Sequence, residues 1–253
     1  MNICLFASDV IGYQTLKTFT TNEYKLTFLV LDSKESKSFN KKMIKLSNLS
    51  AKRIFYSNDL SNDSIIQLLN DAKLDLCILA WWNYIIKKPL LNISKLGFLN
   101  FHPSFLPYNR GKHYYFWNII EKVPFGVSIH FINKDVDTGD IVFQELIQTS
   151  ILDTGFSLRE KSRVAIIKLF NENFNNIINL KLPRKKQNLK KGNFHVSSDL
   201  KDASRIKLDK KYLGQELIDL LRARSGFEKG GAWFEYEDKV YEVKIEIKEV
   251  INE

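Results

Sequence analysis

Asn100 and His102 stand two residues apart in a short apolar run of the sequence. In an extended strand, residues i and i+2 project to the same side, so this amide and this imidazole are expected to point into one space. Pro103 and Pro107 then end regular strand pairing and begin a loop. Farther along, Asp137 supplies a carboxylate at a turn of sequence Asp-Thr-Gly. These groups suit acyl transfer, because they provide an oxyanion donor, a proton carrier and a group that stabilises the charged carrier.

These residues lie in the motif Asn-x-His-Pro-Ser-x-Leu-Pro, which begins at Asn100 and is followed by Gly111 and by the Asp-x-Gly of Asp137. The motif resembles that of the formyltransferases that use formyl-tetrahydrofolate, and the resemblance is dense from about residue 74 to residue 144. In that family the Asn, the His and the Asp of Asp-x-Gly are catalytic. The resemblance therefore implies that Asn100, His102 and Asp137 are the catalytic residues and that formyl-tetrahydrofolate is the formyl donor.

In formyl transfer an amine attacks the formyl carbon, the formyl oxygen gains negative charge, and the amine nitrogen loses a proton. Asn100 can donate its side-chain amide to that oxygen. His102 can take the proton or, as imidazolium, support the oxyanion, and Asp137 can orient His102, stabilise its charge or relay protons through water. The alternative for an isolated pair is that Asn100 caps a turn and His102 is an ordinary loop histidine. The surrounding motif favours catalysis.

The resemblance also implies where folate binds, because this family holds it largely through backbone groups of two segments. Aligned on Asn100, these segments are residues 80–86 and 132–135. The residues that we expect to bind the cofactor are Trp81, Trp82, Tyr84, Ile86, Asn133 and Lys134. A Trp-Trp pair just beyond a strand is equally suited to walling a pterin ring and to covering the core.

An Arg-Gly-Lys-His sequence with an aromatic cluster follows the motif, from Arg110 to Trp117. Formyltransferases that act on amino sugars attached to a nucleoside diphosphate often share this pattern, and their chain lengths resemble that of this 253-residue chain. The resemblance implies an enzyme that formylates dTDP-4-amino-4,6-dideoxyglucose or its 3-amino isomer for surface polysaccharides such as the O-antigen of lipopolysaccharide. The thiols of Cys4 and Cys77, expected to be buried, predict a cytoplasmic location. The residues that we expect to bind this substrate are Ser104, Arg110, Lys112 and His113. Cationic side chains suit a diphosphate, although these residues also fit a solvated loop.

Two other functions fit parts of the sequence. A methionyl-tRNA formyltransferase would share the catalytic motif. A non-catalytic nucleic-acid-binding module would fit the net charge of +9 and the basic and aromatic residues from Lys112 to Trp117. Five of the basic residues, however, fall in one acid-free stretch, at Arg184, Lys185, Lys186, Lys190 and Lys191. Such a run is typical of a solvated linker, which argues against nucleic acid as the partner.

Cys4 and Cys77 each lie in an apolar run. Two buried thiols indicate core packing in a reducing compartment rather than a disulfide, and no Cys/His cluster has the spacing of a zinc site. We therefore expect no metal. No apolar run approaches the ~20 residues of a membrane span. No G-x-G-x-x-G follows the first strand, which argues against a nicotinamide cofactor.

We expect different roles for the histidines outside the motif. His130 alternates with Ser128 in a strand-like run, so it either faces the same space as the catalytic residues or supports them from the core. The sequence indicates no function for His195.

The elements that must position these residues alternate between strands and helices. Apolar runs of strand length occur at 3–6, 26–31, 76–80 and 97–101, and further strands are expected at 53–56, 126–131 and 141–144. Helical periodicity marks residues 13–19 and 64–70, and a long helix is expected at 153–178. This order predicts a doubly wound α/β domain with a mostly parallel sheet, whose ligands bind beyond the carboxyl ends of the strands.

Pro183 and the basic stretch to Gly192 predict a linker at 183–192, between a catalytic domain of residues 1–182 and a small C-terminal module of residues 193–253. The module is predicted to form a helix at 212–224 and a hairpin that turns at Asp238-Lys239. A segment of about 60 residues buries only a marginal core. We therefore expect the module to lean on the catalytic domain or on a second copy in a homodimer.

Overall fold

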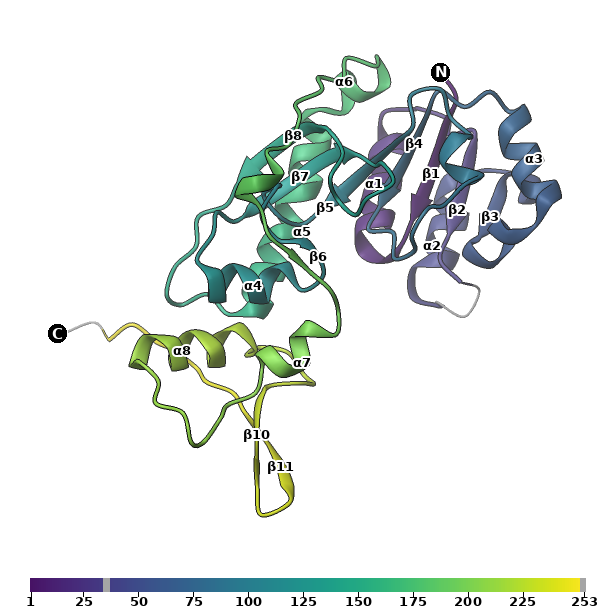
Figure 1. Cartoon of the computed structure of the whole chain (residues 1–253). Helices are drawn as coiled ribbons and strands as arrows, with labels where there is room; N and C mark the ends of the chain where they lie inside the picture. The colour runs from purple at the N-terminus through teal and green to yellow at the C-terminus, as the bar shows by residue number, and fades with distance from the viewer. Residues whose placement is uncertain (34–36, 251–253) are drawn as a thin grey trace. The chain divides into compact units, whose positions relative to one another are not determined.

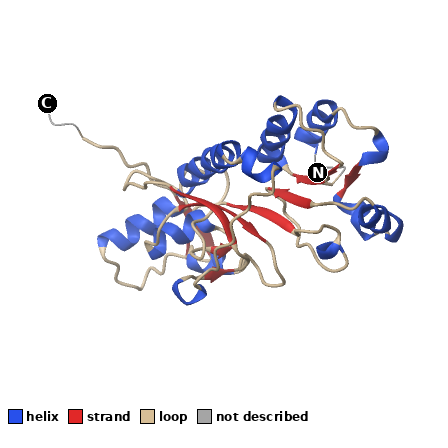
Figure 2. Ribbon diagram, turned by 90° about the horizontal axis from the view of Figure 1, so that it is seen from above, coloured by secondary structure: helices blue, strands red, loops and turns tan. Residues whose placement is uncertain are grey.

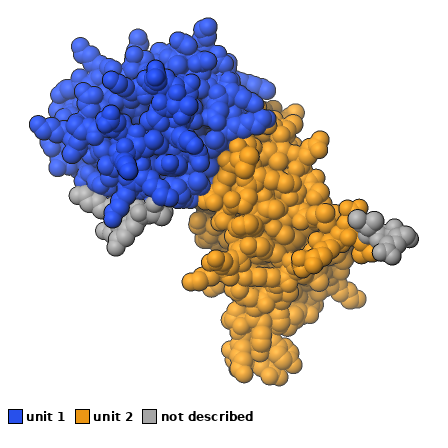
Figure 3. Space-filling view, turned by 180° about the vertical axis from the view of Figure 1, so that it is seen from behind, with its two compact units in different colours: residues 1–102, 128–143, 166–186 blue, residues 103–127, 144–165, 187–253 orange. Residues whose placement is uncertain are grey.

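The computed structural model describes residues 1–33 and 37–250, and the chain forms two compact units (Figure 3). The first unit contains residues 1–102, 128–143 and 166–186, and the second contains residues 103–127, 144–165 and 187–253. The units interleave along the sequence, and the predicted division into residues 1–182, 183–192 and 193–253 stays a prediction. The end of that predicted module, residues 251–253, lies outside the described residues.

A seven-stranded sheet has the spatial order β3-β2-β1-β4-β5-β7-β8 (Figure 1). The strands from β3 to β5 pair in parallel, and β7 pairs with β5 in the opposite direction. The strands are β1 (Ile3–Ala7), β2 (Phe28–Leu31), β3 (Ile54–Tyr56), β4 (Leu76–Ala80), β5 (Phe98–His102), β7 (Gly126–Phe131) and β8 (Ile141–Leu146). This arrangement confirms the doubly wound, mostly parallel α/β fold.

Helices lie on both sides of the strands (Figure 2). No helix in the described part of the chain is long and apolar enough to cross a membrane. α3 packs Ile66 and Leu69 against one set of alternating strand residues, among them Phe6. The intervening residues, such as Leu5 and Leu29, are also fully buried. Both faces of the parallel strands are therefore covered, which explains their continuous apolar runs. The connecting elements are α1 (Asp9–Thr21), α2 (Lys37–Ser47), α3 (Asp63–Asp71) and short 3-10 turns at Ala51–Arg53, Ser57–Ser61 and Leu90–Asn92.

Local contacts set how these helices begin. Gly12 lets α1 lie close to β1, because a Cβ at this position would stand 2.8 Å from the Cβ of Ala7. Asn62 caps α3, since its side-chain oxygen accepts a hydrogen bond from the backbone N–H of Ser64 at 2.9 Å. Both contacts are local in sequence. α3 begins at Asp63, next to its predicted range of 64–70, whereas α1 begins at Asp9, ahead of its predicted range of 13–19.

Two predicted elements differ from the structure. The helix expected at 153–178 is divided into α5 (Gly155–Glu172) and α6 (Phe174–Ile178). The division falls at Asn173, whose side-chain amide donates to the Leu169 carbonyl at 2.9 Å and competes with regular helical bonding. The C-terminal hairpin turns at Glu237 and Asp238 rather than at Asp238-Lys239. Both turn residues have positive φ, 49° and 57°, as a two-residue type I′ turn requires.

The second unit builds its core from α4 (Tyr114–Glu121) and α8 (Gly214–Ala223). Phe116 of α4 and Leu220 of α8 are buried in one cluster with Leu158. The segment beyond residue 193 therefore shares a core with α4. A segment of this size needs such a shared core, because it buries little apolar surface by itself. The other elements of this unit are β6 (Arg110–Gly111), β9 (Phe194–His195), α7 (Asp199–Ala203), β10 (Ala232–Tyr236), β11 (Lys239–Val243) and a 3-10 turn at Leu189–Lys191.

His195 has a structural role in the second unit. Its ring stacks on Trp117 with the ring centroids 3.6 Å apart, and its Nε2 is 2.8 Å from Oε1 of Glu121. β9 also pairs with β6, where Gly111 lies opposite His195. A Cβ on Gly111 would overlap the His195 carbonyl oxygen, and φ at Gly111 is +88°, so the close pairing requires glycine. This pairing holds the backbone of the Arg-Gly-Lys segment.

Candidate active site

β5 carries Asn100 and His102 at its carboxyl end. In the antiparallel pairing of β5 with β7, Asn100 lies opposite His130, and His102 lies opposite Ser128. Directly opposed residues on neighbouring strands project to the same face of a sheet. Asn100, His102 and His130 therefore share one face, and the two histidines are 5% and 0% exposed.

The loop between β7 and β8 carries Asp137. Asp137 has a positive φ of 53°, a left-handed conformation that is uncommon for a residue with a side chain. Gly139 lies against the carbonyl group of Phe131, and a Cβ at position 139 would overlap that oxygen. The Asn133 side-chain oxygen accepts a hydrogen bond from the Thr138 hydroxyl at 2.8 Å. These contacts hold the turn that presents the Asp137 carboxylate.

Asp137 lies between two imidazole rings. Its Oδ2 is 3.4 Å from Nδ1 of His102, and its Oδ1 is 3.5 Å from Nε2 of His130. Asn100 Nδ2 donates toward the same Oδ1 at 3.4 Å. The side chains of His102, His130 and Asp137 are only 6%, 0% and 12% exposed, so water screens their charges weakly. The carboxylate is therefore placed to stabilise an imidazolium at His102.

His130 is a member of this cluster that the motif did not identify. Its Nε2 is 3.2 Å from Nδ2 of Asn100, and its Nδ1 is 2.8 Å from the carbonyl oxygen of Phe131. From the alternation of Ser128 with His130, the sequence predicted that the ring either faces the space of the catalytic residues or supports them from the core. The contact with Asn100 depends on the register between β5 and β7, which strand periodicity does not determine.

The donor atoms of this cluster are close enough to share a metal ion. Within residues 1–33 and 37–250, ligand atoms of His102, His130 and Asp137 lie within 4.8 Å of one another. Two imidazoles and a carboxylate are also a known ligand set for zinc. The Asn100 Nδ2 group, however, lies against both His130 Nε2 and Asp137 Oδ1. An amide N–H donates and has no lone pair for a cation, so these contacts favour a hydrogen-bonded cluster.

We therefore expect catalysis to be independent of metal. Dialysis against EDTA should leave kcat for formyl transfer unchanged, with the metal content checked by elemental analysis. Added Zn²⁺ should inhibit, because a cation bound to His102 and Asp137 would displace the contact through which the carboxylate stabilises the imidazolium. Activity that is lost with EDTA and restored by a divalent metal would contradict this expectation.

The first predicted folate segment follows β4 directly. Ile86 is buried, and Trp82 packs edge-on against Phe6 with ring centroids 5.4 Å apart, so both side chains support the core. Among the described residues, Nε1 of Trp82 is also buried without a hydrogen-bond partner, and Ile85 is 74% exposed. The exposed Ile85 side chain offers apolar surface to a flat ring such as a pterin, whereas Nε1 of Trp82 is shielded from solvent.

The other residues predicted to bind folate are placed differently. Trp81 has a left-handed backbone with φ of 60°. The Tyr84 hydroxyl donates to Oδ1 of Asp32 at 2.6 Å. Asn133 shapes the Asp137 loop, and Lys134 in the same loop is exposed. Both predicted folate segments belong to the first unit, as do Asn100, His102 and Asp137.

The four residues predicted to bind the substrate belong to the second unit. Ser104 is buried, and its hydroxyl donates to the Tyr108 carbonyl at 2.8 Å, so this side chain shapes the loop after β5. The Arg110 guanidinium lies over the Phe194 ring, 5.9 Å from its centroid. Lys112 is exposed.

His113 has a left-handed backbone, with φ of 58°. Burial, together with the nearby cations Arg224 and Lys112, lowers the pKa of His113 below its usual value. The ring is therefore neutral near pH 7. Lys112 rather than His113 supplies positive charge in this segment.

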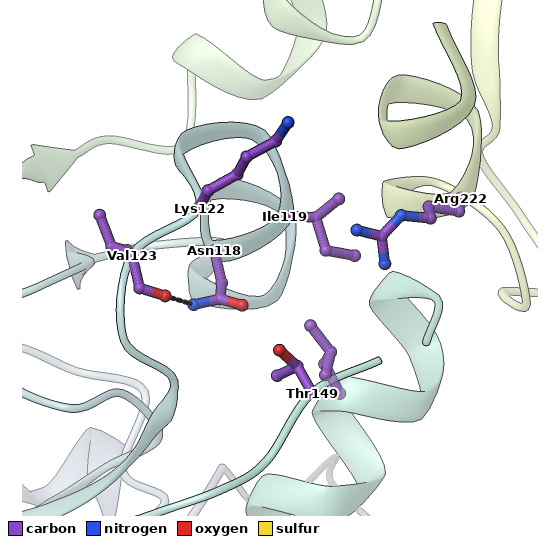
Figure 4. A pocket seen from close by; sticks show the side chains of 7 residues that line it. Asn118, Ile119, Lys122, Val123, Thr149 and Arg222 are labelled. Carbon is purple, nitrogen blue, oxygen red and sulfur yellow. Dashed lines mark hydrogen bonds between the residues drawn. The ribbon is translucent and has the colours of Figure 1, made fainter. Parts of the chain in front are cut away.

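A hollow of about 170 Å³ in the second unit is lined by residues that include Arg222 of α8 (Figure 4). The Arg222 guanidinium donates to Oδ1 of Asp219 and to the carbonyl oxygen of Asp153, each at 2.7 Å. Burial alone would raise the pKa of Asp219, but hydrogen bonds from Arg222 and Gln215 outweigh it and lower that pKa. Asp219 Oδ2 makes no hydrogen bond among the described residues, but it lies 3.4 Å from Nζ of Lys122. Arg222 and Asp219 are thus paired within the protein, so we assign no ligand to the hollow.

Two protein-family models match the chain. The formyl transferase family matches residues 20–172, and the N-formyltransferase dimerization C-terminal domain matches residues 199–249. Among curated relatives, the bifunctional polymyxin resistance protein ArnA of Wigglesworthia glossinidia brevipalpis is 29% identical over 72% of this chain and 28% of its own length. Methionyl-tRNA formyltransferase of Prochlorococcus marinus is 27% identical over 67% of this chain and 54% of its own length. The chain thus spans between about a quarter and about half of these relatives.

Several solved structures share the fold over nearly the whole chain. A sugar N-formyltransferase from a Shewanella species has a TM-score of 0.82 at 22% identity, covering 99% of both chains. A 4-N formyltransferase from Francisella tularensis has a TM-score of 0.80 at 24% identity, covering 98% of both. An N-formyltransferase from Helicobacter canadensis, in complex with folinic acid and dTDP-3-aminofucose, has a TM-score of 0.69 at 19% identity, covering 96% of both. Since the family match spans more than half of the sequence and includes Asn100, His102 and Asp137, the chain belongs to the formyl transferase family.

Proposed function

We propose that this protein transfers a formyl group from formyl-tetrahydrofolate to the amine of an amino-dideoxy sugar carried by a nucleoside diphosphate. The observation that carries the proposal is the cluster in which the Asp137 carboxylate lies 3.4 Å from both His102 Nδ1 and Asn100 Nδ2. An amide donor, an imidazole and a carboxylate within reach of one another provide what acyl transfer to an amine needs.

Each residue has one role in this proposal. Asn100 donates its amide N–H to the formyl oxygen as that oxygen gains negative charge. His102 takes the proton that the attacking amine releases and returns a proton to the departing folate nitrogen, so protons balance over the reaction. Asp137 holds the imidazolium form of His102 between these two transfers. The folate lies along residues 80–86 and 132–135, where the Ile85 side chain is 74% exposed.

Three observations support a sugar nucleotide as the acceptor. The C-terminal match is to a domain of N-formyltransferases, at residues 199–249. The Helicobacter canadensis enzyme, which shares the fold, was solved with dTDP-3-aminofucose and folinic acid. Lys112 supplies exposed positive charge that suits a diphosphate. We therefore propose dTDP-4-amino-4,6-dideoxyglucose or its 3-amino isomer as substrate, for surface polysaccharide synthesis, and a homodimer formed through the C-terminal segment.

One assay decides between this function and its alternative. The protein is incubated with formyl-tetrahydrofolate and, in separate reactions, with a panel of dTDP-, UDP- and GDP-linked amino sugars and with methionyl-tRNA. We expect formylation of at least one sugar amine, detected by mass spectrometry, and none of the tRNA. Formylation of methionyl-tRNA alone would replace the proposal with the tRNA function. Binding of nucleic acid without any formyl transfer would indicate a non-catalytic module.

Lys112→Ala should raise KM for the sugar nucleotide more than it lowers kcat. The reason is that a cation bound to a diphosphate contributes equally to the ground state and the transition state. The matched control is Lys52→Ala, which removes an exposed lysine of the first unit and should leave both constants unchanged. An unchanged KM for Lys112→Ala would remove this residue from the proposed binding site.

A further inference from the structure

His130 is the part of the cluster that the mechanism above does not use. The ring is 0% exposed and lies directly opposite Asn100 in the β5–β7 pairing. A buried imidazole needs hydrogen-bond partners for both of its nitrogens, because unpaired buried polar atoms are costly. The partners that His130 has therefore indicate what the ring does.

The Phe131 carbonyl group determines which nitrogen of His130 carries the proton. Nδ1 of His130 is 2.8 Å from this carbonyl oxygen. A carbonyl oxygen only accepts, so Nδ1 must donate, and in the neutral ring Nε2 is then an acceptor. The carbonyl itself is held in place, since the Phe131 N–H donates to the Asp140 carbonyl at 2.8 Å and Gly139 packs directly against the Phe131 oxygen.

In this neutral tautomer, Nε2 of His130 accepts from the Asn100 amide. Nδ2 of Asn100 is 3.2 Å from His130 Nε2 and 3.4 Å from Asp137 Oδ1, and these two acceptors are 3.5 Å from each other. The three atoms thus form a nearly equilateral triangle. The angle at Nδ2 between the directions to the two acceptors is therefore much smaller than the trigonal angle between its two N–H bonds. One N–H is therefore shared by both acceptors in a three-centre hydrogen bond. The other N–H points away from them.

We propose that His130 is a positioning residue, which together with Asp137 locks the Asn100 amide so that its second N–H is presented to the formyl oxygen. This inference rests on the proposed formyl transfer. If the amide were turned over, its oxygen would face the lone pair of His130 Nε2 and the carboxylate of Asp137, and all three groups repel. The wrong orientation would also turn the amide oxygen toward a formyl oxygen that gains negative charge.

Asp137 alone does not provide this lock, because its two oxygens face different partners. Oδ2 faces His102 at 3.4 Å, and only Oδ1 faces Asn100. The Asp137 carboxylate also interacts with the changing charge on His102, so on its own it would hold the Asn100 amide less firmly. A fixed imidazole ring beside the carboxylate makes the position of the amide firmer. His130 supplies that second, fixed acceptor.

The test compares His130→Leu with His130→Gln, whose side-chain oxygen can still accept from Asn100. We expect His130→Leu to lower kcat for the sugar amine by about 10²-fold, no more than the loss of the oxyanion donor itself, with both KM values nearly unchanged. His130→Gln should restore part of that loss. Thr15→Val is the matched control, because it removes a buried hydroxyl of the same unit that donates to the Ile11 carbonyl within its own helix, and its kcat should stay at the wild-type value.

A double variant separates positioning from general support of the fold. Because His130 acts through Asn100, the variant Asn100→Ala/His130→Leu should be no slower than Asn100→Ala alone. Multiplicative losses in the double variant would overturn the proposal. Retained thermal stabilisation by 5-formyl-tetrahydrofolate shows that each variant is folded and binds the donor.

The tautomer of His130 provides a readout that needs no substrate. In ¹⁵N NMR spectra of the wild-type protein, Nδ1 should carry the proton and Nε2 should have the shift of an unprotonated acceptor. A proton on Nε2 of the neutral ring would overturn the proposal even if formyl transfer is established. Absence of formyl transfer to every amine would instead contradict the proposed function and leave this NMR result standing.

Discussion

Replacing His102 with glutamine is expected to lower kcat for formyl transfer by about 10²- to 10⁴-fold, the range over which a positioned acid–base group accelerates a reaction. Glutamine keeps a polar side chain but cannot take and return a proton near neutral pH. Asp137→Asn should have an effect of similar size. The carboxylate is 3.4 Å from His102 Nδ1 and only 12% exposed, so water replaces its charge poorly.

The two variants should also be coupled. Asp137 acts by holding the charged form of His102, so the double variant His102→Gln/Asp137→Asn should be scarcely slower than His102→Gln alone. Turnover would be measured with saturating formyl-tetrahydrofolate and the sugar nucleotide identified in the acceptor panel. Circular dichroism and thermal stabilisation by 5-formyl-tetrahydrofolate serve as controls for folding. Near-normal turnover of either folded single variant would remove this mechanism.

The second large effect is expected for Asn100→Ala. Loss of one donor to an oxyanion costs about 2.7–4 kcal/mol, which corresponds to a 10²- to 10³-fold decrease in kcat. The KM values for both substrates should change little, because the hydrogen bond strengthens only as the formyl oxygen gains charge.

Asn100→Asp is a more severe test of the same role. The new carboxylate would keep the size of the side chain but face the growing negative charge, and it would stand where Nδ2 is 3.4 Å from Oδ1 of Asp137. Repulsion between like charges should therefore make this variant at least as slow as Asn100→Ala. A folded Asn100→Asp enzyme that is faster than Asn100→Ala would argue against the amide as oxyanion donor.

Part of this picture follows from residues that are local in sequence. The alternation of Asn100 and His102 places both side chains on one face of a strand, because strand periodicity is two and does not depend on the partner strand. The continuous apolar runs at β1, β2 and β4 predicted strands buried on both faces, and the fold confirms them. The family resemblance of the motif is likewise confirmed by the match over residues 20–172.

Other features depended on side-chain hydrogen bonds and on burial, which the apolar pattern of the sequence does not report. Asn173 divides the expected long helix because its side chain bonds the Leu169 carbonyl, a choice that apolar periodicity does not report. Ser104 belonged to the predicted substrate residues by its place in the motif, and burial directs its hydroxyl to the Tyr108 carbonyl. The pKa of His113 is lowered mainly by burial, which is a property of the folded chain.

The sequence by itself determined the fold class, through the order of its apolar runs and helical patterns, and the family resemblance of its motif singled out Asn100, His102 and Asp137. Only the tertiary structure decided how these groups meet. The register of β5 on β7 places His130 against Asn100, and the close approach of Gly139 to the Phe131 carbonyl holds the loop that carries Asp137 between two imidazoles. Pairing register and loop closure are set by the packing of segments far apart in the chain, so no local pattern contains them.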